Sequence, residues 1–160
     1  MSEMARVNVG DHVPDVAVQL EDGPVRLRDY ADGRNVVLYF YPKDGSFVCA
    51  QEARAFNDAL DDFLAANTQV VGVSMDDRAS HIRFAAAEKL RFPLGTDPDR
   101  ALVNAFDASN RLVFGIAAKR VTYLIDGAGV VVRIWDRINP LTHSRDVLDA
   151  VQSLAAVQRA

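Results

Sequence analysis

The stretch NVVLYFYPKDGSFVCAQE, residues 35–52, joins a continuous apolar segment to the single cysteine of the chain. Residues 35–41 are aliphatic, β-branched or aromatic with hardly a break, which is typical of a strand buried on both faces. Pro42 cannot continue such a strand in the interior of a sheet, so we expect the strand to end there. A short loop follows, and helical spacing of apolar residues begins near Phe47.

Cys49 stands at the start of this expected helix, where a thiol is chemically activated. Ser46 occupies the N-cap position, and its hydroxyl can accept a hydrogen bond from a backbone N–H of the first turn. Cys49 is then the third helical residue, where unpaired N–H groups and the positive end of the helix dipole favour thiolate over thiol. It precedes Ala53 by four residues and Phe56 by seven, so we expect it to face inward. A lone cysteine can equally be a small buried apolar residue.

The rest of the chain alternates between strand-like and helix-like spacing of apolar residues. The expected strands are 16–20, 25–27, 69–75, 121–125 and 130–135, with turns at 21–24 and 126–129. The expected helices run from about residue 47 through Leu64, and over 79–90, 100–106 and 147–157, the last one opened by His143 and Arg145. The first of them is expected to bury one face, made of Ala53, Phe56, Leu60, Phe63 and Leu64. The apolar positions expected in the second are Ile82, Phe84, Ala86 and Leu90. This order predicts an α/β fold of thioredoxin-like architecture. A central mixed sheet would carry helices on both faces, after an N-terminal β-hairpin.

The composition is that of one ordinary globular domain. The chain has 160 residues, 49% of them hydrophobic and 25% charged, and we take residues 1–160 as a single domain with its ordered core at roughly 8–155. A net charge of −4 and the lack of a basic run give no attraction for nucleic acid. We find no apolar stretch near the ~20 residues that cross a bilayer and no secretory signal, so we expect a cytoplasmic protein that binds no membrane.

The pattern of cysteine and histidine argues against several kinds of site. One cysteine excludes a disulfide within the chain and a CxxC redox pair. His12, His81 and His143 are widely spaced and none adjoins a carboxylate at ligand spacing, so we expect no metal site and no cofactor. We expect His143 to lie on the surface. The apolar positions Val113, Phe114 and Ile116 are candidates for a subunit interface, in a monomer or a homodimer.

The pattern Pro42-x-x-x-Ser46-x-x-Cys49 resembles the peroxiredoxin active-site signature Pro-x-x-x-Thr/Ser-x-x-Cys. The flanking residues agree, and the segment RVTYLID, residues 120–126, is similar to the late strand that carries the family's active-site arginine. The resemblance covers roughly residues 8–155 and is closest to the bacterioferritin-comigratory, or peroxiredoxin Q, subgroup. It implies a thioredoxin fold and a thiol-dependent peroxidase.

The resemblance implies a role for each matching residue. Cys49 would be the peroxidatic nucleophile, which attacks the terminal oxygen of a hydroperoxide and becomes a sulfenic acid. Ser46 would hold the peroxide and Pro42 would shield the sulfur from water. Arg120 would favour the thiolate and stabilise the charge that develops on the oxygens. Two supporting residues complete the set: Glu52, which would orient the arginine, and Tyr41.

Two features depart from the family pattern. Phe47-Val48 stands where the subgroup commonly has Pro-Gly or Pro-Val, so we expect narrower or more apolar access to Cys49. Arg54 stands where some members place a resolving cysteine. The sulfenic acid must then be reduced by an external thiol, such as thioredoxin or glutaredoxin with glutathione, or two Cys49 residues must pair between chains. The expected substrates are hydrogen peroxide and small organic hydroperoxides.

Two other readings stay open at this point. A redox sensor or thiol-binding protein would use oxidation of Cys49 to alter the affinity for a partner, without efficient turnover. A non-catalytic thioredoxin-fold module would hold Cys49 as an inert buried side chain. The sequence does not specify the physiological reductant, the preferred hydroperoxide, the oligomeric state or the sensitivity to overoxidation.

Overall fold

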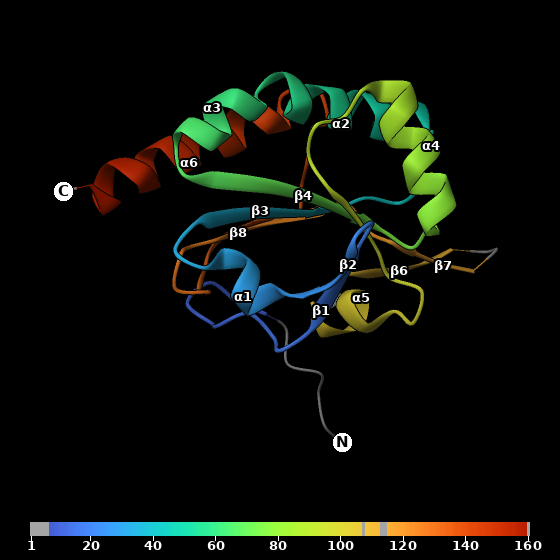
Figure 1. The fold of residues 1–160 in the computed structure, drawn as a ribbon, viewed down its shortest axis with the longest axis horizontal. Helices are drawn as coiled ribbons and strands as arrows, with labels where there is room; N and C mark the ends of the chain where they lie inside the picture. The colour runs from blue at the N-terminus through green and yellow to red at the C-terminus, as the bar shows by residue number, and fades with distance from the viewer. Residues whose placement is uncertain (1–6, 107, 113–114, 160) are drawn as a thin grey trace.

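The computed structural model describes residues 7–106, 108–112 and 115–159, which build layers of helix around one mixed sheet (Figure 1). Seven strands form this sheet in the spatial order β2-β1-β5-β4-β3-β8-β9. Their bounds are Ala17–Leu20 (β1), Gly23–Arg26 (β2), Asn35–Phe40 (β3), Thr68–Ser74 (β4), Leu94–Thr96 (β5), Val121–Ile125 (β8) and Val131–Trp135 (β9). A separate hairpin pairs β6, Ser109–Leu112, with β7, Gly115–Ala118.

Strand β3 lies inside the sheet because both of its faces are apolar and have to be covered. All its residues are buried. It pairs parallel to β4, with Leu38 opposite Val71, and antiparallel to β8, with Leu38 opposite Tyr123. Successive side chains of a strand point to opposite faces, so β3 supplies two separate cores. Leu38 packs in one of them, and Tyr39 packs in the other.

Helices cover both faces of the sheet. The face to which Tyr39 points carries α2 (Phe47–Asp58), α3 (Leu60–Ala65), α4 (Arg78–Glu88) and α6 (His143–Gln158), which lie above the sheet in Figure 1. The opposite face carries α1 (Leu27–Ala31) and α5 (Ala101–Ala105), which lie below it. The predicted fold class is confirmed: the structure is a thioredoxin-like α/β fold with an N-terminal hairpin, β1–β2.

The long helix expected from residue 47 through Leu64 is in fact two helices. The chain leaves the regular helical conformation at Ala59, with φ −92° and ψ 1°, so α3 starts with a new axis. Its buried side chains are Leu60 and Phe63, and Leu64 is turned outward and 47% exposed. Including Leu64 in the buried stripe was therefore wrong.

The prediction for the next helix is partly correct. Of its expected apolar positions, Phe84 is buried and Leu90 is half-buried, but Ile82 is 42% exposed and Ala86 is exposed as well. The second residue that α4 buries is His81, three positions before Phe84 on the same side of the helix. Hydrophobicity alone could not predict that the polar His81 faces inward.

Two smaller corrections concern the other elements. The turn of the first hairpin is shorter than expected because Gly23 adopts φ +127°, and β2 ends at Arg26, so Leu27 opens α1, which was not predicted. The hairpin β6–β7 was not predicted either. The last helix begins at His143, which was expected to open it. The candidate interface residues Val113 and Phe114 lie outside the described residues, as does the side chain of Ile116.

Candidate active site

Cys49 lies in the first turn of α2, the helix that follows β3 after the loop at residues 41–46. Ser46 is the N-cap, as predicted, and its Oγ accepts a hydrogen bond of 3.3 Å from the Cys49 backbone N–H. Cys49 is the third residue of α2 and is only 2% exposed. Its side chain joins the core cluster that contains Tyr39, Ala53 and Phe56. The thiol therefore combines a position near the positive end of the helix dipole with exclusion from bulk water.

Arg120 immediately precedes β8 and reaches across the core to the sulfur. Its Nη2 donates to Cys49 Sγ at 3.4 Å, and its Nη1 donates to Glu52 Oε1 at 2.6 Å. Glu52 lies three residues after Cys49, on the same side of α2. The side chains of Arg120 and Glu52 are 18% and 1% exposed. The structure thus brings together three of the predicted site residues, with the guanidinium between the carboxylate and the sulfur.

The charges of this group depend on one another. Burial raises the pKa of Glu52 to about 7, against the effect of Arg120, whose charge and hydrogen bond act to lower it. Burial acts to lower the pKa of Arg120, but Glu52 and Cys49 outweigh it and the pKa rises above its ordinary value. Arg120 therefore stays charged beside the sulfur. Glu52 Oε2 is buried and has no hydrogen-bond partner in the described part of the chain.

Pro42 and Tyr41 lie at the start of the loop that leads to Ser46. Pro42 is half-buried and Tyr41 is fully buried. The Tyr41 hydroxyl donates to Asp44 Oδ1 at 2.5 Å, and its backbone N–H donates to the Val73 carbonyl. Tyr41 shares the core cluster of Cys49, but its hydroxyl is directed to the loop.

Two residues of this region were not found from the sequence as parts of the site. Tyr39 is 1% exposed, and its hydroxyl is one of two buried side-chain oxygens without a partner among the described residues. Burial raises its pKa, and the charges of Glu52 and Cys49 raise it further, so it remains a phenol. Gly72 makes room for it, because a Cβ there would lie 2.9 Å from the Tyr39 hydroxyl. The sequence contained a signal for this: Tyr39 lies on β3 two positions before Tyr41, and residues two positions apart in an extended segment share a face.

His143 is the second residue of this region that was not found from the sequence. It was expected on the surface, but it is 2% exposed, and its Nε2 lies 2.7 Å from Thr122 Oγ1. The rings of Phe56 and Trp135 flank it, with centroids 5.7 and 5.8 Å away. Burial lowers the pKa of His143 to about 4, so it is a neutral imidazole near neutral pH. The prediction was wrong because a helix-start histidine resembles a solvated residue until its hydroxyl partner on β8 is known.

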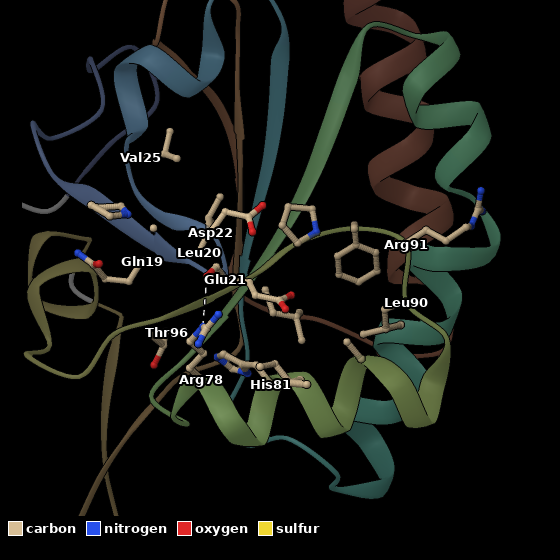
Figure 2. Close-up of a pocket in the computed structure, with 17 residues that line it drawn as sticks. Gln19, Leu20, Glu21, Asp22, Val25, Arg78, His81, Leu90, Arg91 and Thr96 are labelled. Carbon is tan, nitrogen blue, oxygen red and sulfur yellow. Dashed lines mark hydrogen bonds between the residues drawn. The ribbon is translucent and has the colours of Figure 1, made fainter.

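A pocket of about 450 Å³ lies elsewhere, between the β1–β2 hairpin and α4 (Figure 2). Its lining includes Glu21, Arg78 and Leu90, and Cys49 is not part of it. Among the residues that the structure describes, no three His, Cys, Asp or Glu side chains gather as a metal site would require. Within the same residues no helix is long and apolar enough to span a membrane.

Comparison with known proteins identifies the class. Residues 9–134 match the AhpC/TSA family. The chain is 36% identical over 146 residues to peroxiredoxin Bcp of Xanthomonas campestris, which covers 88% of this chain and 91% of that protein. It is 31% identical to peroxiredoxin Bcp of Bacillus subtilis, over 93% of this chain and 98% of the relative. The crystal structure of a PrxQ mutant from Xylella fastidiosa superposes with a TM-score of 0.87 at 31% identity, over 94% of this chain and 99% of that one.

The chain therefore belongs to the AhpC/TSA family of peroxiredoxins, and its relatives of the Bcp and peroxiredoxin Q type indicate a thiol-dependent peroxidase. Its single cysteine sets it apart from any enzyme that closes a disulfide within one chain. The resemblance stated from the sequence is confirmed.

Proposed function

We propose that this chain reduces hydrogen peroxide and small organic hydroperoxides, with Cys49 as the nucleophile and an external thiol as the reductant. The contact that carries the proposal joins Arg120 Nη2 to Cys49 Sγ at 3.4 Å, in the first turn of α2. A permanently charged guanidinium and the helix N-terminus both act to stabilise a thiolate, and the thiolate is the reactive form of cysteine.

In the first step, the Cys49 thiolate attacks the terminal oxygen of the hydroperoxide. The S–O bond forms, the O–O bond breaks, and the second oxygen leaves with the electron pair and takes up a proton from solvent to become water or an alcohol. Negative charge moves from sulfur onto that leaving oxygen. Arg120 contacts the sulfur already, and the Ser46 hydroxyl carries a proton that it can donate to a bound peroxide. Glu52 holds Arg120 in place through its bond to Nη1.

The burial of the sulfur supports a small substrate. Cys49 is 2% exposed, whereas the preceding Phe47 and Val48 are 74% and 39% exposed. Hydrogen peroxide or a short alkyl hydroperoxide is small enough to reach a sulfur so buried, and these two exposed apolar residues beside it in the chain are proposed to favour an apolar alkyl group. Half-buried Pro42 flanks the loop and is proposed to keep bulk water from the sulfur.

The second half of the cycle requires electrons from outside the chain. A thiol condenses with the sulfenic acid, water leaves, and a mixed disulfide with Cys49 forms. A second thiol then attacks this disulfide, which releases the Cys49 thiol and an oxidised disulfide of the reductant. The chain contains no other cysteine to take this part. Thioredoxin and glutaredoxin with glutathione are the proposed candidate reductants.

Steady-state turnover with a panel of reductants tests the proposal. Wild-type protein is mixed with hydrogen peroxide and, separately, thioredoxin, glutaredoxin with glutathione, or a small dithiol. We expect peroxide consumption with at least one of them and none above background for Cys49→Ser. Single oxidation of Cys49 without turnover by any reductant would refute the enzyme and favour a redox sensor. Slow alkylation of native Cys49, with peroxide consumption unchanged by Cys49→Ser, would favour the inert module.

A further inference from the structure

A buried polar cluster, separate from the Cys49–Arg120–Glu52 group, holds the loop that leads to the active-site helix. Its centre is Asp44, which lies between Pro42 and Ser46 and has a side chain only 4% exposed. Asp44 Oδ1 accepts from the Tyr41 hydroxyl at 2.5 Å, and Oδ2 accepts from the Ser80 hydroxyl at 2.8 Å. Oδ2 also lies 2.7 Å from Nδ1 of His81.

The ring of His81 has a polar neighbour at each nitrogen. Its Nδ1 faces the Asp44 carboxylate, and its Nε2 lies 3.0 Å from the carbonyl oxygen of Gly95 on β5. The Tyr41 hydroxyl also lies 3.4 Å from Nδ1. The side chain of His81 is 6% exposed, so water would not replace a contact that the ring loses.

Asp44 has the complementary environment. Burial acts to raise its pKa, but the hydrogen bonds from His81, Tyr41 and Ser80 outweigh burial and hold the pKa below its ordinary value. Three donors converge on its two oxygens, which is the surrounding that an ionised carboxylate needs. Asp44 and His81 are thus a buried pair in direct contact.

The backbone of the loop is held at the same point. The Asp44 N–H donates to Asp76 Oδ2 at 2.8 Å, and the same oxygen accepts from the Ser74 hydroxyl at the end of β4. The neighbouring loop residues Lys43, Gly45 and Ser46 are exposed, so they supply no buried anchor. The position of Ser46, and with it the first turn of α2, therefore depends on the contacts of Asp44.

We propose that His81 is a positioning residue for the peroxidase reaction: through its buried contact with Asp44, it fixes the loop that sets Ser46 and Cys49 against Arg120. The proposal rests on the proposed function for its kinetic consequence. The structural part of the proposal, which is the buried pair and the loop that it holds, does not rest on that function. His81 lies on α4 at the side of the pocket in Figure 2, far along the chain from the loop that it holds.

Nuclear magnetic resonance of the isotope-labelled imidazole nitrogens tests the contact directly. The ring-nitrogen signals of His81 are assigned by their loss in His81→Gln. In Asp44→Asn we expect these signals to shift, because Nδ1 loses its carboxylate partner. Unchanged His81 signals in folded Asp44→Asn would overturn the proposal.

Kinetics and labelling test the positioning role. Both His81→Gln and Asp44→Asn are expected to slow the single-turnover reaction with hydrogen peroxide by about tenfold or more and to accelerate alkylation of the buried Cys49, the chain's single thiol. The double variant should be no slower than the single variants, because both remove one interaction. Asp61→Asn is the matched control, since it removes the same kind of carboxylate from an exposed pair with Arg91 at 2.8 Å and contacts neither Asp44 nor His81.

The outcomes separate this proposal from the peroxidase itself. Rates and alkylation within about twofold of wild type in folded His81→Gln and Asp44→Asn, or an equal effect of Asp61→Asn, would show that the pair does not position the site. If His81→Gln fails to fold, Asp44→Asn and the wild-type spectrum decide alone. If wild-type protein does not react with peroxide, the proposed function fails, while the alkylation rates and the spectrum still report on the pair.

Discussion

Substitution of Arg120 by methionine gives the sharpest quantitative prediction. Arg120→Met keeps much of the aliphatic length but removes two contacts, Nη2 to Cys49 Sγ at 3.4 Å and Nη1 to Glu52 Oε1 at 2.6 Å. The loss of the cation also removes the factor that opposes burial at Glu52, so the pKa of Glu52 moves above about 7 and the residue becomes neutral near neutral pH. The variant therefore loses the guanidinium without leaving a bare buried carboxylate.

The magnitude follows from the contact with sulfur. A hydrogen bond to a charged group is worth about 1.5–3 kcal/mol, and about 1.4 kcal/mol corresponds to a factor of ten in rate. We therefore expect the second-order rate constant for hydrogen peroxide to fall between about tenfold and a hundredfold. The ultraviolet absorbance of the Cys49 thiolate near neutral pH should fall in the same variant. Arg120→Lys should recover part of the rate, because a lysine keeps the charge without the planar fork.

The assay is single-turnover stopped flow, with the fluorescence of Trp135, the single tryptophan, as the signal. Arg54→Met is the matched control: Arg54 is also on α2, pairs with Glu88 at 2.9 Å and has a half-exposed side chain. Its rate should stay within about twofold of wild type. If Arg120→Met reacts as fast as wild type, the guanidinium is not needed and the helix N-terminus alone activates the thiol.

Three further variants test the capping residue and the two buried titrating groups. Ser46→Ala should lower the free energy of unfolding by about 1 kcal/mol and slow the peroxide reaction, while Ser46→Thr preserves both; an Ala variant as fast as wild type would exclude a role in binding peroxide. The folded pKa of Glu52, about 7, lies above its ordinary 4.5, so its stabilising contribution is complete below pH 4.5 and is lost as pH rises through 7. Denaturant unfolding should show a loss of about 3 kcal/mol over that window relative to Glu52→Gln, and equal slopes would contradict the burial argument. The folded pKa of His143, about 4, lies below its ordinary 6.5, so its contribution is present above pH 6.5 and is lost as pH falls through 4. His143→Gln should be less sensitive to acid in this window, and a variant as acid-sensitive as wild type would refute the assignment.

The part of the site that is local in sequence could be predicted. The apolar run of β3, the stop at Pro42 and the cap at Ser46 depend on residues within a few positions of one another. Propensity and capping chemistry act over that range, and so the third helical position of Cys49 followed. The break at Ala59 and the short helix α1 could not be read with the same rules, because tertiary packing rather than local preference decides them.

Contacts between residues far apart in the sequence could not be predicted from these local rules. Arg120 is 71 positions from Cys49, and its place against the sulfur came from the family resemblance rather than from spacing. No such signal existed for Asp44 and His81, which are 37 positions apart. A buried polar side chain and an exposed one have the same letter in the sequence, and burial is decided by a partner on another element. For this reason His143 was wrongly expected on the surface, and the contact of His81 with Asp44 was not predicted.

The most direct test of the central claim is rapid mixing of reduced protein with hydrogen peroxide, followed by mass spectrometry of Cys49. The account predicts a rate constant orders of magnitude above that of free cysteine, with a sulfenic acid on Cys49 as the first product. A rate no faster than that of free cysteine would contradict it. The arrangement of Arg120, Glu52 and Cys49 would then serve the fold rather than peroxide reduction.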